Sequence, residues 1–397
     1  MVQCKQLAAG FVLLCGAAMA SLAQPQTPAV SPGSPAPASG SPVALWQAYA
    51  SSFLSSDGRV IDPQGANRTT SEGQSYALFF ALVNNDRARF DQVLAWTQSN
   101  LAGGNLGPHL PAWEWGHRKD GTWGQLDPNS AADSDLWIAY DLLEAGRLWH
   151  LPAYTAIALR MLHQIARRET TTLPGFGPVL LPGEYGFHLK GSWILNPCYT
   201  PLFLLRRLAK ADPTGPWAGI AMLQSSLIEH SSPGGFAMDW VSYTPGSGFL
   251  PSRSNSIQTD GALGSYDAIR VYTWAGMTSP EEPSRAAILA ALHGMRDYLL
   301  QHNAPPEKVN AMGVPLPNDG PVGFSAAVLP FLQETGQTAE AQKQLQRVES
   351  QLDEKTGLYG KVPTYYDQNL ILFGLGWSQR QFQFSPDGEL WVTWQQK

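Results

Sequence analysis

The sequence predicts an all-α protein in which six helical hairpins close into a double ring. Hydrophobic side chains recur at helical spacing in twelve segments, mostly in consecutive pairs, and few stretches alternate as strands do. Two long segments, 103–130 and 231–264, contain glycine, proline and tryptophan, and we expect them to be functional loops. The helices are predicted over residues 43–56, 74–84, 86–99, 135–148, 153–168, 198–210, 216–229, 265–276, 281–302, 323–334, 337–352 and 367–376.

The chain of 397 residues begins with a segment typical of a secretory signal. Lys5 precedes the apolar run LAAGFVLLCGAAMASLA, whose last residues are small enough for a signal peptidase, so we expect residues 1–23 to be removed. That run is too short to span a membrane. Residues 24–42 are rich in proline, alanine and serine and should form a linker, which leaves residues 43–397 as one domain. The protein is therefore expected in the periplasm or outside the cell.

The first candidate functional residue lies at the start of a predicted helix. In TTSEGQSYALFFALV (69–83), apolar residues recur at i, i+3, i+4 and i+7 from Tyr76, as in a buried helix. Ser71 and Gln74 fit a capping box, which would place Glu72 in the first turn. Glu72 could there simply complement the helix dipole, a contribution of about 0.3–1 kcal/mol.

Two further acidic sites precede predicted helices. In DPNSAADSDLWIAYDLLEAGRLW (127–149), Asp133 and Asp135 stand where the helix begins, and Asp135 has the position of an N-cap. In GALGSYDAIRVYTWAGM (261–277), Asp267 is expected in the first turn, after a Ser265 cap. Arg270 follows three residues later. It could form a structural ion pair with Asp267, worth about 0.3–0.5 kcal/mol if exposed, or keep Asp267 ionised.

These three acidic sites are expected to share one cleft. Alternate helices of such a ring start at the same end, so Glu72, Asp133 and Asp267 should converge. Two carboxyl groups on opposite sides of a glycosidic bond are what glycoside hydrolysis requires. A helix N-terminus lowers a carboxyl pKa, whereas a general acid needs a raised pKa. If Glu72 is the acid, burial or the charge of Asp133 must outweigh the dipole.

Composition restricts the class of partner. Charged residues make up 15% of the chain and the net charge is −6, which argues against nucleic acid and anionic membranes. Tryptophan is abundant: there are 14 residues, many of them between positions 96 and 149. Such density suits a core, and it also suits a long groove for neutral sugar rings, whose faces stack on flat aromatic surfaces.

Other chemistries lack the residues that they need. Removal of the signal would leave Cys198 as the only cysteine, so neither an intramolecular disulfide nor a cysteine metal site is expected. His109, His117 and His188 lack the spacing of metal ligands, and GSGF (246–249) lacks the strand–helix context of a phosphate loop. No nucleophile elbow supports a Ser-His-Asp triad. We therefore expect no metal and no cofactor.

Three segments together resemble a known family. SEGQSYALFFAL, AADSDLWIAYDLLEAGRLW and SYDAIRVYTWAGM are similar to the signature segments of glycoside hydrolase family 8. They most resemble those of the periplasmic endo-1,4-β-glucanases associated with bacterial cellulose synthases. The likeness runs from about Val43 to about Gly376. It implies an (α/α)6 barrel as the catalytic domain and an inverting mechanism on β-1,4-glucan.

The resemblance also implies a role for each acidic residue. Glu72 matches the proton donor, Asp267 the base that activates water, and Asp133 the residue that holds the distorted sugar. Ala132 and Ser134 depart from the family pattern, which often has Ser or Thr before this aspartate and Gly or Ala after it. The residues predicted to bind the sugar chain are Trp113, Trp115, Trp123, Trp193, Tyr199, Tyr266 and Arg270.

Each of these loop aromatics could equally belong to the core, except Trp113 and Trp123, whose polar and glycine-rich loops favour exposure. We expect an exported, monomeric endo-β-1,4-glucanase that trims cellulose during its export, with the cellulose synthase export complex as a further partner. Chitosan, xylan and mixed-linkage glucan are alternative substrates. A non-catalytic glucan-binding protein of the secretion apparatus would tolerate loss of the acid or base, and an (α/α)6 lyase would want more basic residues than the 26 present.

Overall fold

The computed structural model describes residues 40–396. The predicted signal peptide and residues 24–39 of the predicted linker lie outside the described residues. The first helix, α1, begins at Pro42, one residue before the predicted start. The Ser41 side chain caps it by accepting a hydrogen bond from the Ala44 N–H at 3.2 Å. Proline suits the first helical turn because its missing N–H would have no partner there.

The predicted helical fold is confirmed, and each predicted helix is present in the described part of the chain. Two of them are broken. The segment 323–334 divides before Pro330, which has no N–H for the helical ladder, and the segment 281–302 divides at Leu292. The helices are α1 Pro42–Phe53, α2 Ser71–Val83, α3 Arg87–Leu101, α4 Ala132–Leu148, α5 Pro152–Arg168, α6 Leu202–Ala211, α7 Trp217–His230, α8 Ala268–Met277, α9 Arg285–Ala291, α10 His293–Leu299, α11 Val322–Ala327, α12 Leu329–Glu334, α13 Thr338–Glu349 and α14 Tyr365–Ser378.

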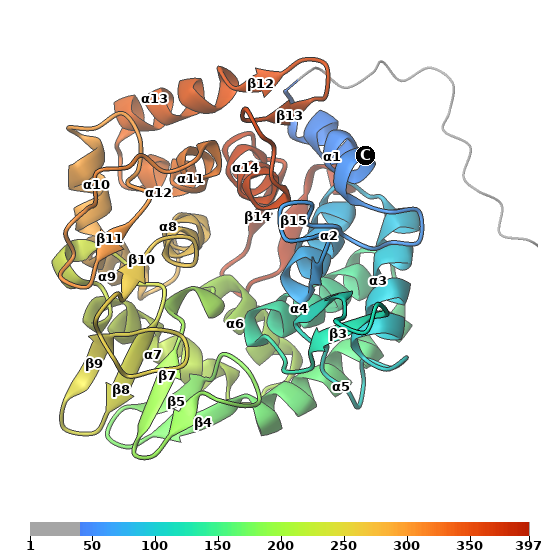
Figure 1. The fold of residues 1–397 in the computed structure, drawn as a ribbon, viewed down its shortest axis with the longest axis horizontal. Coiled ribbons are helices and arrows are strands. Elements are labelled where there is room, and N and C mark those ends of the chain that lie inside the picture. The colour runs from blue at the N-terminus through green and yellow to red at the C-terminus, as the bar shows by residue number, and fades with distance from the viewer. Residues whose placement is uncertain (1–39, 397) are drawn as a thin grey trace, which may run out of the picture. The chain divides into compact units, whose positions relative to one another are not determined.

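Alternate helices form an inner and an outer ring, as expected of an (α/α)6 barrel (Figure 1). The inner ring holds α2, α4, α6, α8, the α11–α12 pair and α14, and the remaining helices lie outside it. Burial separates the rings. Helices α2 and α4 are buried on almost every side, whereas α5 buries only the stripe Ala158, Met161, Leu162 and Ile165. A helix buried all round belongs inside a core, and a one-sided stripe belongs at its edge.

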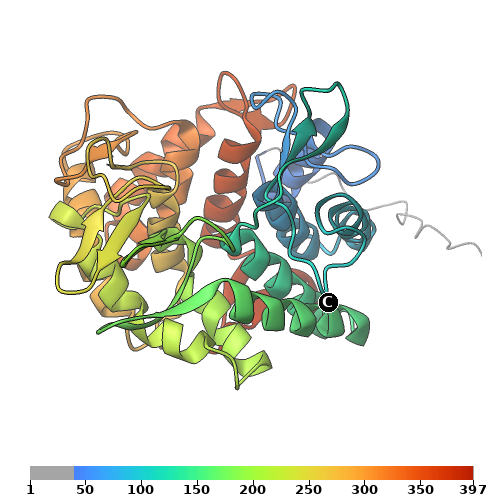
Figure 2. The same cartoon turned by 60° about the horizontal axis from the view of Figure 1, so that its bottom comes forward.

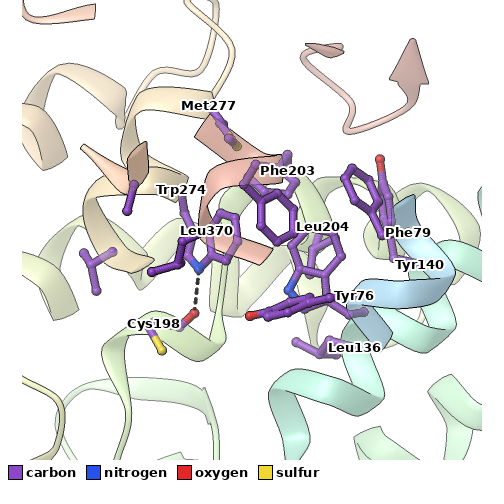
Figure 3. Close-up of a cluster of buried hydrophobic side chains, with 14 of the residues drawn as sticks. Tyr76, Phe79, Leu136, Tyr140, Cys198, Phe203, Leu204, Trp274, Met277 and Leu370 are labelled. Atoms are coloured by element: carbon purple, nitrogen blue, oxygen red, sulfur yellow. Dashed lines mark hydrogen bonds between the residues drawn. The ribbon is translucent and has the colours of Figure 1, made fainter. Parts of the chain in front are cut away.

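Aromatic side chains of the inner helices fill the centre of the ring (Figure 3). The ring centroid of Phe79 on α2 lies 5.1 Å from that of Trp137 on α4 and 5.4 Å from that of Phe373 on α14. Trp274 of α8 donates its indole N–H to the Cys198 carbonyl at 3.1 Å. These contacts bind the inner helices to one another, so the helix ends that face the site are held by a packed core.

The long loops contain short strands that the sequence analysis did not predict, because two to five residues are too few for alternation to be visible. The hairpin β2–β3 extends past the helix ends in Figure 2 and pairs with β1, with Thr69 opposite Trp115. None of the described helices is long and apolar enough to cross a membrane. The strands are β1 Thr69–Thr70, β2 Glu114–His117, β3 Trp123–Asp127, β4 Thr170–Leu173, β5 Gly177–Leu180, β6 His188–Leu189, β7 Ser192–Leu195, β8 Val241–Thr244, β9 Gly248–Pro251, β10 Leu263–Gly264, β11 Val309–Asn310, β12 Leu352–Asp353, β13 Leu358–Tyr359, β14 Phe382–Phe384 and β15 Leu390–Val392.

Candidate active site

Arg270 of α8 is the residue around which the three predicted carboxylates meet. Its side chain is only 3% exposed. Its Nη1 donates to Glu72 Oε2 and lies 3.3 Å from Asp133 Oδ2, while its Nη2 donates to Asp267 Oδ1. The carboxylates come from the N-terminal ends of α2, α4 and α8, so the predicted convergence is confirmed. The predicted ion pair between Arg270 and Asp267 is also present, but the arginine holds two further carboxylates.

The start of α2 is capped differently from the prediction. Thr70, not Ser71, is the cap, and its Oγ1 accepts from the Gly73 N–H at 3.1 Å. The capping box is wrong because Gln74 is buried and bonds elsewhere. Its Oε1 accepts from the Val60 N–H at 2.6 Å, and its Nε2 donates to the Thr97 hydroxyl at 2.9 Å. Thr70 therefore caps the helix, and Gln74 bonds to Val60 and Thr97. Glu72 lies in the first turn, and its side chain points into the site.

Burial decides the protonation of Glu72. Burial raises the pKa of the Glu72 carboxyl to about 7, and the charges of Asp133 and Asp267 add to this, while Arg270 opposes it. The carboxyl is therefore largely protonated in mildly acidic solution, which is what a general acid working near neutral pH requires. A raised pKa is what a catalytic Glu72 at a helix N-terminus requires.

Asp133 lies in the first turn of α4 and is buried. Its Oδ1 accepts from the backbone N–H of Ser134 at 2.7 Å and from the Ser134 hydroxyl at 3.2 Å. Burial raises the pKa of Asp133, and the Arg270 charge opposes that rise. Ser134 stands where the family pattern often has Gly or Ala, so it supplies a hydroxyl contact to Asp133 that those residues lack.

The predicted N-cap role of Asp135 is wrong. Helix α4 begins after Ala131 without a side-chain cap, and Asp135 is fully buried beside Glu169. Burial and then the charge of Glu169 hold the pKa of Asp135 well above its usual range, and burial raises the pKa of Glu169 to about 8. Two buried neighbouring carboxyl groups cannot both ionise, so this pair retains a proton at neutral pH. The Ser130 hydroxyl donates to Glu169 on its other side.

The predicted Ser265 cap of α8 is also wrong. Asp267 occupies the N-cap position, and its side chain makes no capping bond. Asp239, from the loop before β8, takes the donors instead. Its Oδ1 accepts from the N–H groups of Ser265, Asp267 and Ala268 at 2.7, 3.1 and 2.8 Å, and its Oδ2 accepts from the Ser265 hydroxyl at 2.7 Å. Burial and the charge of Asp267 raise the pKa of Asp239 to about 6, while these donors lower it.

Two cavities adjoin at Glu72. The first, of about 500 Å³, is lined by Asp62, Gln64, Arg68, Glu72, Tyr266, Asp267, Arg270, Pro321, Thr364, Tyr365, Tyr366 and Asp367. The second, of about 190 Å³, is lined by Arg68, Thr70, Ser71, Glu72, Trp113, Ala131, Asp133, Ser134, Tyr199 and Tyr365. The acidic residues are thus divided between them. Asp267 lies in the first, Asp133 in the second and Glu72 in both, so a polymer that occupied both cavities would pass Glu72.

Four of the predicted sugar-binding residues line these cavities. Tyr266 and Arg270 contribute to the first cavity, and Trp113 and Tyr199 to the second. Tyr266 is 43% exposed and offers its ring to solvent. An aromatic side chain is thus present on each side of Glu72, in the arrangement that stacking along a sugar chain would need.

Three predicted binding residues lie elsewhere and line neither cavity. Trp115 and Trp123 stack on each other on the β2–β3 hairpin, with 5.2 Å between ring centroids, and Arg59 lies over both rings. Trp123 is 46% exposed, which agrees with the exposure expected of its loop. Trp193 is buried in β7 and stacks on His188 at 4.9 Å. Their part in sugar binding remains a prediction.

Sequence reasoning missed several residues of the site. Tyr76 was identified only as part of an apolar stripe, yet its hydroxyl accepts from Arg270 Nη1 at 2.9 Å. Its position one helical turn after Glu72 could have indicated that its hydroxyl faces the site. Arg68 and Tyr365 line both cavities and lie in segments where no pattern marked them. Among residues 40–396, no cluster of three His, Cys, Asp or Glu side chains is arranged to hold a metal ion.

Comparison with known proteins matches most of the chain to one family. The family described as "Glycosyl hydrolases family 8" matches residues 17–380. An endoglucanase of Xanthomonas axonopodis pv. citri is 47% identical over 363 residues, 90% of this chain and 91% of that one. An endoglucanase of Escherichia coli K12 is 42% identical over 353 residues, with 89% and 91% covered. The crystal structure of an endo-1,4-D-glucanase from Vibrio fischeri matches with a TM-score of 0.78 and 40% identity, covering 88% of this chain and 99% of that one.

Proposed function

Because the chain belongs to the glycosyl hydrolases of family 8 and is an endo-1,4-β-glucanase, we propose that it cleaves its substrate by inversion, with Glu72 as acid and Asp267 as base. One observation carries the assignment. Glu72 is the only one of the three converging acidic residues that lines both cavities, and its raised pKa keeps a proton available. A glycosidic bond held where the cavities meet would lie against that proton.

The proposed reaction uses one proton donor and one water. Glu72 gives its proton to the glycosidic oxygen as the bond from that oxygen to the anomeric carbon breaks. Asp267 takes a proton from a water, whose oxygen attacks the anomeric carbon from the opposite face. Asp133, on the second-cavity side of Glu72, would hold the sugar in its distorted form. The reaction ends with Glu72 ionised and Asp267 protonated, and proton exchange with solvent restores both.

Substitution of Glu72 tests the acid role. Glu72→Gln keeps the shape and removes the transferable proton, so hydrolysis of carboxymethylcellulose should fall at least about a hundredfold while glucan binding persists. Glu114→Gln is a matched control. Glu114 bonds Arg68 at 2.9 Å but lines neither cavity, so this variant should stay within a few-fold of wild type. Activity of Glu72→Gln close to wild type would return Glu72 to a role in the helix dipole.

Product stereochemistry tests the base role. If Asp267 acts through water, the carboxyl groups of Glu72 and Asp267 should stand about 6.5–9.5 Å apart and a β-linkage should give an α-anomer first. A proton NMR time course on cellohexaose, read before mutarotation, distinguishes the anomers. A β-anomer appearing first would mean a covalent intermediate and would remove Asp267 from the role of base.

We further propose that the substrate is cellulose and that the enzyme trims it during export in the periplasm. The relatives named endoglucanases, the signal-like residues 1–23 and the cleft aromatics support this. A product profile on soluble β-glucans, chitosan and xylan separates cellulose from the alternative polymers. N-terminal sequencing of the exported protein should begin near Gln24, and a cytoplasmic chain that keeps Met1 would refute the location.

A further inference from the structure

The Asp239 side chain binds backbone N–H groups at the start of α8. Its carboxylate receives four hydrogen bonds, of which three come from backbone N–H groups where the helix begins. Three of these donors share Oδ1 and one binds Oδ2, so both oxygens of the carboxylate are engaged at the start of the helix. Asp239 lines neither cavity, which excludes direct contact with a sugar held there. It must act through the helix that it caps.

The residue that would normally cap α8 is Asp267 itself. Aspartate is among the best N-cap residues, and a capping side chain folds back onto the N–H groups of the first turn from an extended backbone. Asp267 instead has helical dihedrals, φ −77° and ψ −47°, and makes no capping bond. Its carboxylate accepts from Arg270 and lines the first cavity. Asp239 thus accepts from the N–H groups where α8 begins, and Asp267 faces the cleft.

The loop that carries Asp239 is attached to α8 at several points. The Asp239 N–H donates to the Leu263 carbonyl at 2.9 Å, and the Ala237 N–H donates to the Tyr272 hydroxyl of α8 at 2.9 Å. Gly264 allows this approach, because a Cβ there would collide with the Ala237 carbonyl oxygen. The Asp239 carboxylate is therefore held in place relative to the backbone of Asp267.

We propose that Asp239 is a positioning residue for hydrolysis, which caps α8 from outside and so leaves the Asp267 carboxylate free to face the reacting water. The inference rests on the proposed role of Asp267 as base. Without Asp239, the N–H groups of Asp267 and Ala268 would lose their acceptor, so the backbone that carries the Asp267 carboxylate would shift to find other partners. Misplacement of a reacting group by about 1 Å can cost about a hundredfold in rate.

The test compares kcat, KM and melting temperature on cellopentaose for variants of the full chain. Asp239→Ala should lower kcat by about tenfold to a hundredfold and leave KM within about twofold. Asp239→Asn keeps one acceptor oxygen, so its loss in kcat should be smaller, about threefold to tenfold. Asp86→Ala is the matched control. Asp86 caps α3 by accepting from the Arg89 N–H at 3.3 Å, so its loss should lower the melting temperature and leave kcat unchanged.

A double variant separates positioning from general stability. If Asp239 acts only through Asp267, the variant Asp239→Ala with Asp267→Ala should be no slower than Asp267→Ala alone. An Asp239→Ala enzyme that melts lower but keeps wild-type kcat would overturn the inference, and so would a double variant slowed by the full factor of Asp239→Ala. If Asp239→Ala does not fold, wild-type kcat in Asp239→Asn overturns it. An active Asp267→Ala enzyme would instead refute the proposed base.

Discussion

Replacement of Arg270 by methionine should make the stability of the enzyme strongly dependent on pH. Arg270→Met keeps most of the aliphatic stem and removes the guanidinium that joins Glu72, Asp133 and Asp267. The three carboxyl groups would then face one another without a cation. Glu72 and Asp133, whose pKa values burial already raises, would hold their protons to a higher pH, because like charges also favour the neutral form.

The magnitude follows from the burial of the four side chains. Removing one partner of a buried ion pair costs about 3–5 kcal/mol. The exposed fractions are 3% for Arg270, 6% for Asp133, 19% for Glu72 and 25% for Asp267, so two of the carboxylates keep some solvation. We therefore expect a loss of about 3 kcal/mol in the free energy of unfolding at pH 8, at the lower end of that range.

The pH dependence has a definite sign. A carboxyl whose folded pKa lies above its unfolded value binds more protons in the folded state, so stability falls as pH rises past the unfolded value of about 4. Arg270 opposes the raised pKa of Glu72, and its removal lets that pKa rise further. The loss caused by Arg270→Met should thus be small at pH 5 and larger at pH 8.

Urea unfolding followed by tryptophan fluorescence at both pH values measures this difference. Arg87→Met is the matched control, because Arg87 of the outer helix α3 pairs with the single carboxylate of Asp91 at 3.6 Å. That variant should lose about 1 kcal/mol or less, because the two side chains of this pair are 54% and 47% exposed, and should keep its activity. Equal losses for Arg270→Met at pH 5 and pH 8 would show that the arginine contributes packing and not charge balance.

The remaining predictions concern the cleft and the neighbouring β2–β3 hairpin. The pH profile of kcat/KM for the wild type should fall as pH rises through about 7, because Glu72 must be protonated to act as acid. Asp133→Asn removes a charge that raises the pKa of Glu72, so this alkaline limb should move to lower pH, and an unmoved limb would contradict the coupling. Trp113→Ala and Trp123→Ala should weaken cellohexaose binding in calorimetry and leave the melting temperature nearly unchanged. Unchanged binding would show that neither ring contacts the sugar chain.

The helices could be predicted from sequence because helical periodicity is a local property. Apolar side chains recur at helical spacing in the predicted segments, and the observed helices follow these segments closely. Two prolines explain where the observed helices differ from the predicted ones. Pro330 divides one predicted helix, and Pro201 delays the start of α6, because neither can donate to the helical ladder.

Helix caps and hydrogen-bond partners were less predictable from sequence, because the folded chain decides which donors and acceptors lie next to a polar side chain. The sequence position of Gln74 fitted a capping box, but in the folded chain its side chain forms hydrogen bonds with Val60 and Thr97. Aspartate is a residue type that often caps helices. Asp135 instead forms a buried carboxyl pair with Glu169, 34 positions away (169 − 135). Short-range patterns contain no information about such long-range neighbours.

The sequence by itself determined the helical ring, the three acidic residues at helix N-terminal ends and the family. Hydrophobic spacing and local motifs carry those properties, and they do not depend on how distant segments meet. Only the tertiary structure decided that Arg270 joins all three carboxylates, that Asp239 caps α8 in place of Asp267 and that Trp193 is buried away from the cavities. Those outcomes depend on burial and on contacts between separate helices and loops, which arise only when the ring closes.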